Sequence, residues 1–266
     1  MFEKSVNLAE RVIVTQKGTK KRADLLLVER GLAESREKAQ ALIMAGLVNH
    51  PGGKVAKPGD SLPADVPLKL KGKLPYVSRG GIKLAHALDL FGLEVSEFVT
   101  LDVGASTGGF TDCLLQRGAR RVYAVDVGHG QLDYGLRRDP RVVVMEGVNA
   151  HHPFSLPILD PGGSESEKVP VATVDVSFIS VTKVAANISN HLEEGGRLIA
   201  LVKPQFEARR EEVGRGGVIK DPAVHAKVLA RVIVWAVGAG FRLCGLTPSP
   251  ILGDAGNREF FLLLRK

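Results

Sequence analysis

Four polar residues stand beside apolar runs in the second part of the chain, and their types could do acid–base chemistry. Asp175 belongs to the run "VATVDV", Lys203 follows "RLIALV", and Glu259 opens the final apolar run. Lys83 lies farther upstream in "GGIKLAHAL". A lysine held near a carboxylate and a second cation can act as a general base, because such neighbours tune its pKa. Taken singly, each of the four could instead be an ordinary solvated or ion-paired side chain.

A second group of residues combines a glycine loop with a carboxylate. The stretch "LDVGASTGGFTDCLLQRGARRVYAVDVGHG", from Leu101 to Gly130, reads as strand, glycine loop, helix, strand and then Asp126. A loop after the first strand of a doubly wound sheet lets backbone N–H groups approach a ligand, and Asp126 could accept hydrogen bonds from ribose hydroxyls. The glycine spacing is neither that of a dinucleotide fold nor that of a phosphate loop. The pattern therefore favours S-adenosylmethionine over NAD and ATP, while a tight turn without a ligand stays open as the alternative.

Alternating apolar strands and helices would position both groups. Runs such as "RLIALV" and "RVVVM" are apolar without alternation, which is typical of parallel strands covered on both faces. We therefore predict an α/β class domain with a doubly wound, mostly parallel seven-stranded sheet. Strands are expected near 99–104, 121–127, 142–147, 171–177, 197–203, 241–247 and 259–265, with helices near 81–91, 109–117, 180–192 and 222–239.

The first part of the chain shows a different pattern. A helix is expected from Arg22 to Gly31, and Ser35 is a good N-cap for a second helix ending at Gly46. Short apolar pairs beyond it read as a small twisted sheet. We predict a leader over 1–18, a small α+β domain over 19–70, a linker over 71–78 and the α/β domain over 79–266.

The charge of the chain is concentrated in this first part. The 266 residues carry a net charge of +7, and between Lys17 and Lys73 there are twelve Lys and Arg against six Asp and Glu, a difference of +6. Such a distribution favours an acidic partner such as nucleic acid, although a generally solvated basic surface remains the simpler alternative. The residues expected to contact RNA are Lys20, Lys21, Arg22, Arg36, Lys38 and, at the start of the larger domain, Arg79.

Several classes of protein are disfavoured by composition. Cys113 and Cys244 lie far apart in apolar runs, so neither a disulfide framework nor a zinc site is expected. No apolar run reaches the roughly 18 residues that span a bilayer, and the first residues lack the apolar core of a signal peptide. We expect a cytoplasmic protein without a membrane role. His151 and His152 are adjacent but have no further ligand cluster, so no metal is expected.

Six longer motifs carry a resemblance to a known family. They are "VSRGGIKL", "LDVGASTGGFTDCLL", "AVDVGHGQLDYGLRRDPRV", "DVSFIS", "LVKPQFEARREEVGRGGVIKDP" and "GLTPSPILGDAGNREF". Together they resemble the haemolysin A family of two-domain ribosomal RNA ribose methyltransferases that use S-adenosylmethionine, from about residue 20 to the end of the chain. The resemblance implies an N-terminal RNA-binding domain of the ribosomal protein S-four type and an FtsJ-like methyltransferase domain.

The resemblance also implies roles for individual residues. The family's Lys-Asp-Lys-Glu tetrad falls on Lys83, Asp175, Lys203 and Glu259. Asp126 would take the ribose of the cofactor, and Asn149 would lie near its adenine. The full set predicted to bind the cofactor is Asp102, Gly104, Ser106, Gly108, Gly109, Phe110, Asp126 and Asn149.

The function expected from this resemblance is methyl transfer from S-adenosylmethionine to a ribose 2'-hydroxyl of ribosomal RNA, at a cytidine, with ribosomal RNA or ribosomal subunits as partner. Lys203 would take or polarise the hydroxyl proton, Asp175 and Glu259 would orient it, and Lys83 would help place the nucleotide. The basic loop 207–220 could close over RNA or be a solvated loop. Three rivals remain: a membrane-active haemolysin, a non-catalytic RNA-binding assembly factor and a small-molecule methyltransferase.

Overall fold

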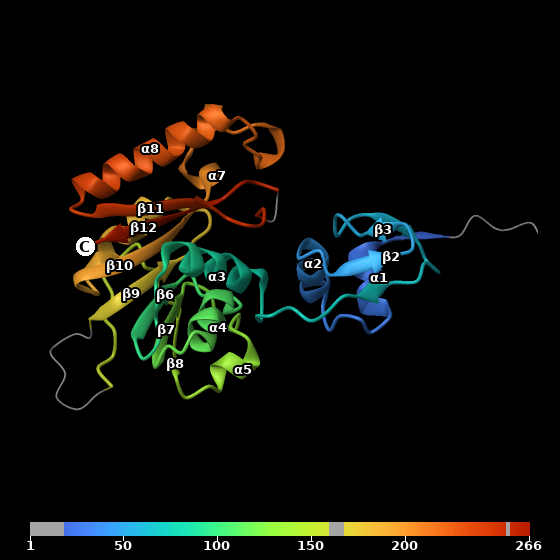
Figure 1. The fold of residues 1–266 in the computed structure, drawn as a ribbon, viewed down its shortest axis with the longest axis horizontal. Coiled ribbons are helices and arrows are strands. Elements are labelled where there is room, and N and C mark those ends of the chain that lie inside the picture. Colours follow the sequence, from blue (N-terminus) through green and yellow to red (C-terminus); the bar gives the residue numbers. More distant parts are fainter. Residues whose placement is uncertain (1–18, 160–167, 254–255) are drawn as a thin grey trace, which may run out of the picture. The chain divides into compact units, whose positions relative to one another are not determined.

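The computed structural model describes residues 19–159, 168–253 and 256–266 of the chain. The predicted leader over 1–18 lies outside the described residues. The chain divides into two units, 1–73 and 74–266, so that the division falls inside the segment predicted as a linker. We describe each unit by itself (Figure 1).

The smaller unit is built from two helices and five short strands. Ser35 accepts a hydrogen bond from the backbone N–H of Lys38, which confirms it as the N-cap of α2. The predicted small sheet is confirmed, with β2 between β3 and β5, whereas the separate two-stranded sheet of β1 and β4 was not predicted. The elements are β1 (Lys20–Arg22), α1 (Ala23–Glu29), α2 (Arg36–Met44), β2 (Val48–His50), β3 (Gly53–Lys54), β4 (Ser61–Pro63) and β5 (Lys69–Leu70).

A buried carboxylate organises the smaller unit. The side chain of Asp24 is closed to solvent and accepts hydrogen bonds from Arg22, Arg36 and Gln40. Its hydrogen bond with the Arg22 guanidinium is the main reason why its pKa lies well below the usual range. The ion pairs therefore join β1, α1 and α2.

The larger unit is an α/β domain around one seven-stranded sheet, as predicted. The strand order is β11-β12-β10-β9-β6-β7-β8, and β12 points in the direction opposite to the other six of these described strands. The strands are β6 (Val99–Val103), β7 (Arg121–Asp126), β8 (Val142–Glu146), β9 (Val169–Val174), β10 (Leu192–Val202), β11 (Arg242–Pro248) and β12 (Phe260–Arg265). The helices are α3 (Arg79–Phe91), α4 (Gly109–Gln116), α5 (Tyr134–Arg137), α6 (Val181–Ser189), α7 (Pro204–Glu207) and α8 (Pro222–Gly238), with 3₁₀ turns η1 (Arg210–Glu212) and η2 (Arg215–Gly217).

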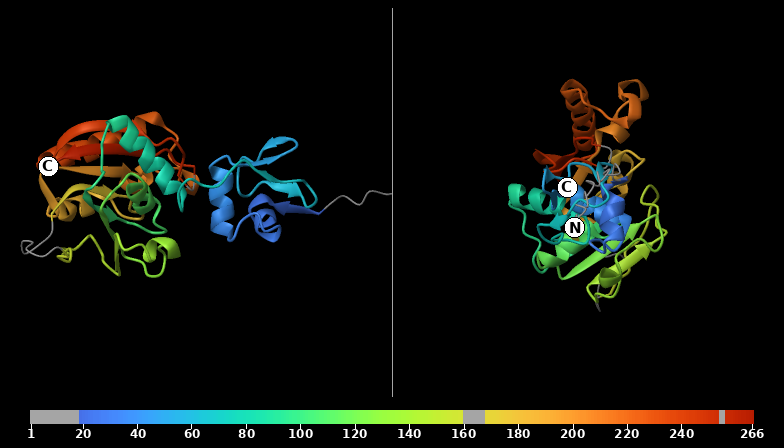
Figure 2. Two further views of the ribbon diagram at one scale, coloured as in Figure 1. Left: turned by 60° about the horizontal axis from the view of Figure 1, so that its bottom comes forward. Right: turned by 90° about the vertical axis from the view of Figure 1, so that its right-hand side faces the viewer.

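Helices cover both faces of this sheet, as Figures 1 and 2 show. Residues of α3, α4 and α5 pack on one face in a core that includes Leu88, Leu114 and Leu136. Residues of α6 and α8 pack on the other face around Ile188 and Val232. Burial on both faces explains why these strands are apolar without alternation.

The strand order reverses between β6 and β9, which lie side by side and parallel. From β6 the chain continues to β7 on one side, and from β9 it continues to β10 on the other. Loops that leave two such strands in opposite directions open a crevice at the carboxyl ends of the sheet, and ligands of doubly wound proteins bind there. The glycine loop follows β6, and Asp175 follows β9.

Candidate active site

The strand register brings three of the predicted tetrad residues to one edge of the sheet. Ala200 of β10 pairs with Val174 of β9, directly before Asp175, and Val202 pairs with Phe260 of β12. Because β12 is antiparallel to β10, the residue that precedes β12, Glu259, lies at the same edge as the residue that follows β10, Lys203. The antiparallel strand thus delivers a carboxylate to the carboxyl edge of a parallel sheet.

Lys203 forms a close ion pair with Asp175. Its Nζ lies 2.6 Å from Asp175 Oδ1 and donates a hydrogen bond of 2.8 Å to Ser177 Oγ. The two charged side chains are 12% and 21% exposed, so both remain accessible from solvent. Pro204 follows at the first position of α7 and restricts Lys203 to extended backbone, which sends its side chain out of the strand end. An amine beside a carboxylate at an open strand end has the composition of an acid–base centre.

Lys83 and Glu259 form the second pair, which is more deeply buried. Lys83 Nζ lies 2.6 Å from Glu259 Oε2, and the side chains are 10% and 3% exposed. Lys83 comes from α3, on the face of the sheet that α4 also covers. The structure therefore resolves the tetrad into two lysine–carboxylate pairs, one partly open and one closed.

Glu259 is held by an arrangement of its own. A Cβ added to Gly253 would lie 2.3 Å from Glu259 Oε1, so any side chain at this position would displace the carboxylate from its present place. Asn257, which is 1% exposed, donates from Nδ2 to the carbonyl of Gly217 and accepts from the N–H of Ile219. Asn257 thereby joins the segment before β12 to the segment that leads into α8.

The glycine loop passes close to the segments that carry Asp175 and Lys83. Gly104 has φ +83°, and a Cβ there would lie 2.2 Å from the carbonyl oxygen of Asp175. A Cβ on Gly109 would lie 2.2 Å from Ser78 Oγ, at the N-cap of α3. Glycine is therefore required at both positions for steric reasons, and the loop touches the segments that carry Asp175 and Lys83.

Asp126 lies beside this loop at the end of β7. Its carboxylate accepts hydrogen bonds from the backbone N–H groups of Ser106, at 2.8 Å, and Gly128, at 2.7 Å. Ser106 has φ +48°, the left-handed region that non-glycine residues rarely adopt, and the bond to Asp126 helps to hold it there. Each carboxylate oxygen has lone pairs left for a ligand hydroxyl, so this geometry is compatible with the predicted ribose contact.

Asp102 and Phe110, also predicted to bind the cofactor, lie inside the domain instead. Asp102 is 0% exposed and accepts hydrogen bonds from Thr111, at 2.7 Å, and Thr173, at 2.9 Å. Burial raises the pKa of Asp102 to about 6. Phe110 is 3% exposed and packs 6.1 Å from the ring of Phe261. Since neither side chain reaches the crevice, the structure offers both predictions no support.

Asn149 lies after β8, one strand farther from the reversal point than Asp126. Its side chain is exposed, and Oδ1 accepts a hydrogen bond from the N–H of His151. The rings of His151 and His152 stack 5.2 Å apart. In the described part of the chain no group of three or more His, Cys, Asp or Glu is arranged to hold a metal ion. The adenine contact of Asn149 stays a prediction.

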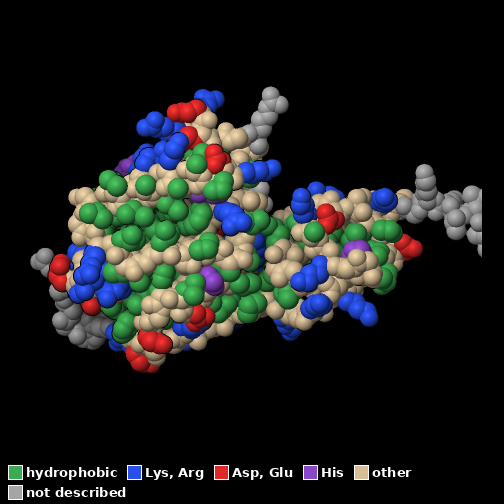
Figure 3. All heavy atoms as spheres, turned by 45° about the horizontal axis from the view of Figure 1, so that its top comes forward, with side chains coloured by type: hydrophobic (Ala, Val, Ile, Leu, Met, Phe, Trp, Pro, Cys, Tyr) green, Lys and Arg blue, Asp and Glu red, His purple; other side chains and the backbone are tan. Residues whose placement is uncertain are grey.

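The residues predicted to contact RNA differ in their surroundings. Lys21 pairs with Glu29, and Arg22 and Arg36 pair with Asp24 while keeping side-chain exposures of 46% and 49%. Lys20 is exposed on β1, Lys38 lies half-buried on α2, and Lys and Arg side chains are prominent on the smaller unit in Figure 3. Arg79 is different, because it is 8% exposed and its guanidinium donates to the carbonyl of Leu252 at 2.5 Å. Arg79 therefore connects the start of α3 to the segment that precedes β12 within the larger unit.

Sequence reasoning did not identify three residues that hold the site together: Ser177, Asn257 and Glu207. Ser177 follows Asp175 by two positions, a spacing that could have marked it as a neighbour of Lys203. Asn257 and Glu207 carried no comparable signal, because their partners lie on segments distant in sequence.

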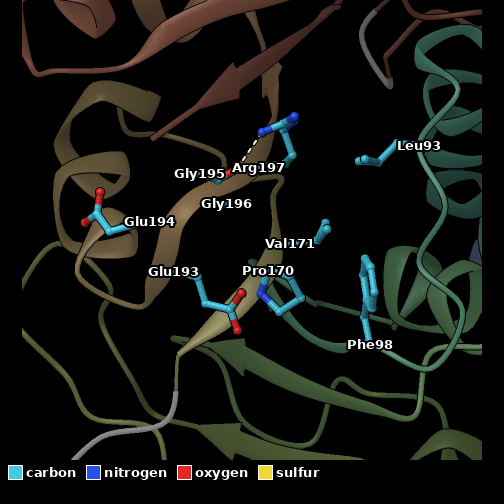
Figure 4. A pocket seen from close by; sticks show the side chains of 9 residues that line it. All are labelled: Leu93, Phe98, Pro170, Val171, Glu193, Glu194, Gly195, Gly196 and Arg197. Atoms are coloured by element: carbon cyan, nitrogen blue, oxygen red, sulfur yellow. Dashed lines mark hydrogen bonds between the residues drawn. The ribbon is translucent and has the colours of Figure 1, made fainter.

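The larger unit also has an open hollow, but at the other edge of the sheet. It lies where β6 and β9 begin, and Phe98, Pro170 and Arg197 are among the residues that line it (Figure 4). Ligands of this fold class bind at the carboxyl ends of the strands, so the hollow is separate from the candidate site.

The fold, the reversal point with its glycine loop and the paired lysines and carboxylates together define a methyltransferase-like α/β architecture. The FtsJ-like methyltransferase family model matches residues 76–266, and the chain belongs to this family. Its cofactor is S-adenosylmethionine. None of the described helices has the length and apolar character needed to cross a membrane.

Several relatives are similar over nearly the whole chain. YqxC of Bacillus subtilis, named as a candidate rRNA methyltransferase, is 49% identical over 92% of this chain and 85% of its own. The 16S/23S rRNA (cytidine-2'-O)-methyltransferase TlyA of Mycobacterium tuberculosis is 42% identical over 92% of this chain and 89% of its own. A solved structure described as a candidate hemolysin from Streptococcus thermophilus is 46% identical, with a TM-score of 0.70 over 93% of this chain and 89% of that one.

The residues present fit S-adenosylmethionine. The backbone of Gly104 lies so close to Asp175 that a Cβ at this position would clash with it. The Asp126 carboxylate lies at the edge of the loop and can still accept hydrogen bonds from two ligand hydroxyls. When bound, S-adenosylmethionine supplies an electrophilic methyl group on a sulfonium centre. The acid–base groups for its acceptor would then be Lys203 and Asp175.

Proposed function

We propose that this methyltransferase acts on a ribose 2'-hydroxyl of ribosomal RNA, at a cytidine, in the cytoplasm where ribosomes are found. The observation that carries the proposal is the ion pair of Lys203 and Asp175, which stands partly open at the strand reversal and next to the glycine loop. A ribose hydroxyl is a weak acid, so its oxygen becomes a competent nucleophile only as its proton leaves. Lys203 supplies an amine at the place where that proton must go.

The residues around the pair have distinct tasks in this proposal. The 2'-oxygen attacks the methyl carbon, the carbon–sulfur bond breaks with its electrons going to sulfur, and the hydroxyl proton passes to Lys203 after its ammonium group has released a proton to solvent. Asp175 and Ser177 hold that amine in place. The closed pair of Lys83 and Glu259 fixes the neighbouring wall of the site, a positioning task rather than the direct nucleotide contact expected for Lys83 from sequence.

Two further observations support ribosomal RNA as the substrate. The TlyA relatives are named for cytidine 2'-O-methylation of ribosomal RNA. The smaller unit exposes a basic surface around β1 and α2, where Arg22 and Arg36 keep about half of their side chains in solvent.

The experiment uses the full chain, labelled S-adenosylmethionine and separated ribosomal subunits. Methylated RNA is hydrolysed with alkali, which cleaves every linkage except those next to a 2'-O-methylated ribose. We expect the label in alkali-resistant dinucleotides whose 5' nucleoside is cytidine. Label recovered in a base would contradict the ribose assignment, and binding of cofactor and subunits without label would favour a non-catalytic assembly factor.

A further inference from the structure

The segment between β9 and α6 carries Asp175 at one end and the N-terminus of a helix at the other. It contains Phe178, a bulky residue with φ +65° and a 92% exposed side chain. A positive φ at such a residue is strained and persists only where the surroundings impose it. The segment 176–180 therefore depends on contacts from outside for its conformation.

Those contacts come from the single turn of α7. Lys203, its N-cap residue, forms an ion pair with Asp175 and donates a hydrogen bond to Ser177 at the beginning of the segment. The Phe206 ring lies 5.2 Å from the ring of Phe178 in the middle.

Glu207 holds the end of the same segment. One carboxylate oxygen accepts from the backbone N–H of Val181 at 2.7 Å, and the other accepts from Ser180 Oγ at 2.5 Å. These donors are the N-cap and first residue of α6, so the negative charge also meets the positive end of a nine-residue helix. Burial raises the pKa of Glu207, whereas these two hydrogen bonds act in the opposite direction.

We infer that Glu207 is a positioning residue for methyl transfer, which fixes the segment 176–181 against α7 so that Asp175 and Lys203 keep one mutual geometry. The inference rests on the proposed function for its catalytic consequence. Lys203 and Glu207 lie at the two ends of one helical turn and hold the two ends of the facing segment. Loss of the Glu207 contact would let that segment, and with it the proton acceptor, drift from its place.

The test compares Glu207→Ala and Glu207→Gln in the full chain. Alanine removes both acceptor oxygens. Glutamine keeps a side-chain carbonyl oxygen that can accept from the Val181 N–H, and its side-chain NH₂ group can donate to the Ser180 hydroxyl. The matched control is Asp221→Ala, which removes another N-cap carboxylate that accepts from Ala223 N–H at 2.8 Å, at α8. Single-turnover methylation of ribosomal subunits, cofactor affinity by calorimetry and amide hydrogen exchange over 176–181 are measured for each.

We expect Glu207→Ala to raise exchange over 176–181 and to slow methyl transfer by about 10-fold to 100-fold, the usual loss when a catalytic group is misplaced by about 1 Å. Cofactor affinity should stay within about 2-fold, Glu207→Gln should recover most of the rate, and Asp221→Ala should leave rate and exchange unchanged. Should Glu207→Ala not fold, Glu207→Asp replaces it, because aspartate keeps the charge but is one methylene too short.

Two results would overturn the inference: unchanged exchange over 176–181 in Glu207→Ala, or raised exchange with a wild-type transfer rate. If the wild-type protein methylates no ribosomal RNA, the proposed function fails. The exchange data still decide in that case whether Glu207 holds the segment, so the two failures are distinguishable.

Discussion

Lys83 and Glu259, 176 residues apart in the chain, join their charges at 2.6 Å in a place almost closed to solvent. A buried charge that loses its partner costs about 3–5 kcal/mol, whereas replacing both partners by apolar side chains is often nearly neutral. We expect Lys83→Met alone to lower the free energy of unfolding of the larger unit by about that amount. Urea denaturation should show that Lys83→Met with Glu259→Leu recovers much of the loss. If the loss of unfolding free energy in the double variant equals the sum of the losses in Lys83→Met and Glu259→Leu, the two residues do not form a pair in solution.

The second prediction concerns the proton acceptor. Lys203→Met keeps the length and the apolar stem but removes the amine, so we expect methyl transfer to fall by about 10²-fold or more, with cofactor affinity near normal. Single-turnover kinetics with ribosomal subunits measure the rate. The matched control is Lys183→Met, at an exposed lysine of α6, and it should transfer methyl groups normally. A wild-type rate in Lys203→Met would remove Lys203 from the mechanism and make Lys83 the next candidate.

Asp126 gives a third prediction, on cofactor binding. Asp126→Ala should weaken S-adenosylmethionine by about 1.5–3 kcal/mol, the value of charged hydrogen bonds, as measured by calorimetry. The variant also loses the bonds to Ser106 and Gly128, so a second ligand is needed to separate the effects. S-adenosylhomocysteine with a deoxyribose should lose less affinity on Asp126→Ala than the ribose form does. Equal losses for both ligands would show that Asp126 acts only by ordering the loop.

The buried carboxyl group of Asp102 gives a prediction about pH. Its pKa rises from 3.8 to about 6 on folding, so its contribution to stability is fully present below pH 3.8 and is lost as the pH rises through 6. Asp102→Asn cannot ionise and should gain stability over the wild type as the pH rises across this window, by at most about 3 kcal/mol. Urea denaturation of residues 74–266 at pH 4.5 and pH 8 measures this. A difference that does not change with pH would contradict the burial of an ionised Asp102.

The fifth prediction concerns the smaller unit. Deleting residues 1–73 should leave cofactor binding intact and weaken binding to ribosomal RNA, with a shallower dependence on salt because fewer phosphate contacts release counterions. Filter binding between about 50 and 200 mM salt gives the slope. If the shortened chain methylates ribosomal subunits as well as the full chain does, the basic surface is not needed for recognition.

The sequence predicted the sheet of the larger unit well, because strands buried on both faces are marked by continuous apolar runs. The largest differences are the start of β10, which begins at Leu192 rather than near residue 197, and the end of β9, which ends at Val174 rather than near residue 177. The polar pair Glu193 and Glu194 and the glycines after them hide the start of β10, where the register with β9 shifts. The short elements β1, α5 and α7 were missed, since three or four residues are too few to display a period.

The tetrad positions followed from resemblance, and the convergence of strand ends followed from the fold class, but the pairing did not. Which lysine meets which carboxylate depends on the antiparallel direction of β12 and on the room that Gly253 leaves for Glu259. The burial of Asp102 and Phe110 could not be predicted for a similar reason: adjacent residues of a strand or helix point to different sides, and sequence proximity to a loop does not decide which side a residue faces.

The contact between Gly104 and the carbonyl of Asp175 links two motifs that lie about seventy residues apart. A side chain introduced at Gly104, for example in a loop redesigned for another cofactor, would displace the end of β9 and with it Asp175 of the acid–base pair. The two motifs can change only together, so cofactor choice and the chemistry at the acceptor are inherited as one unit.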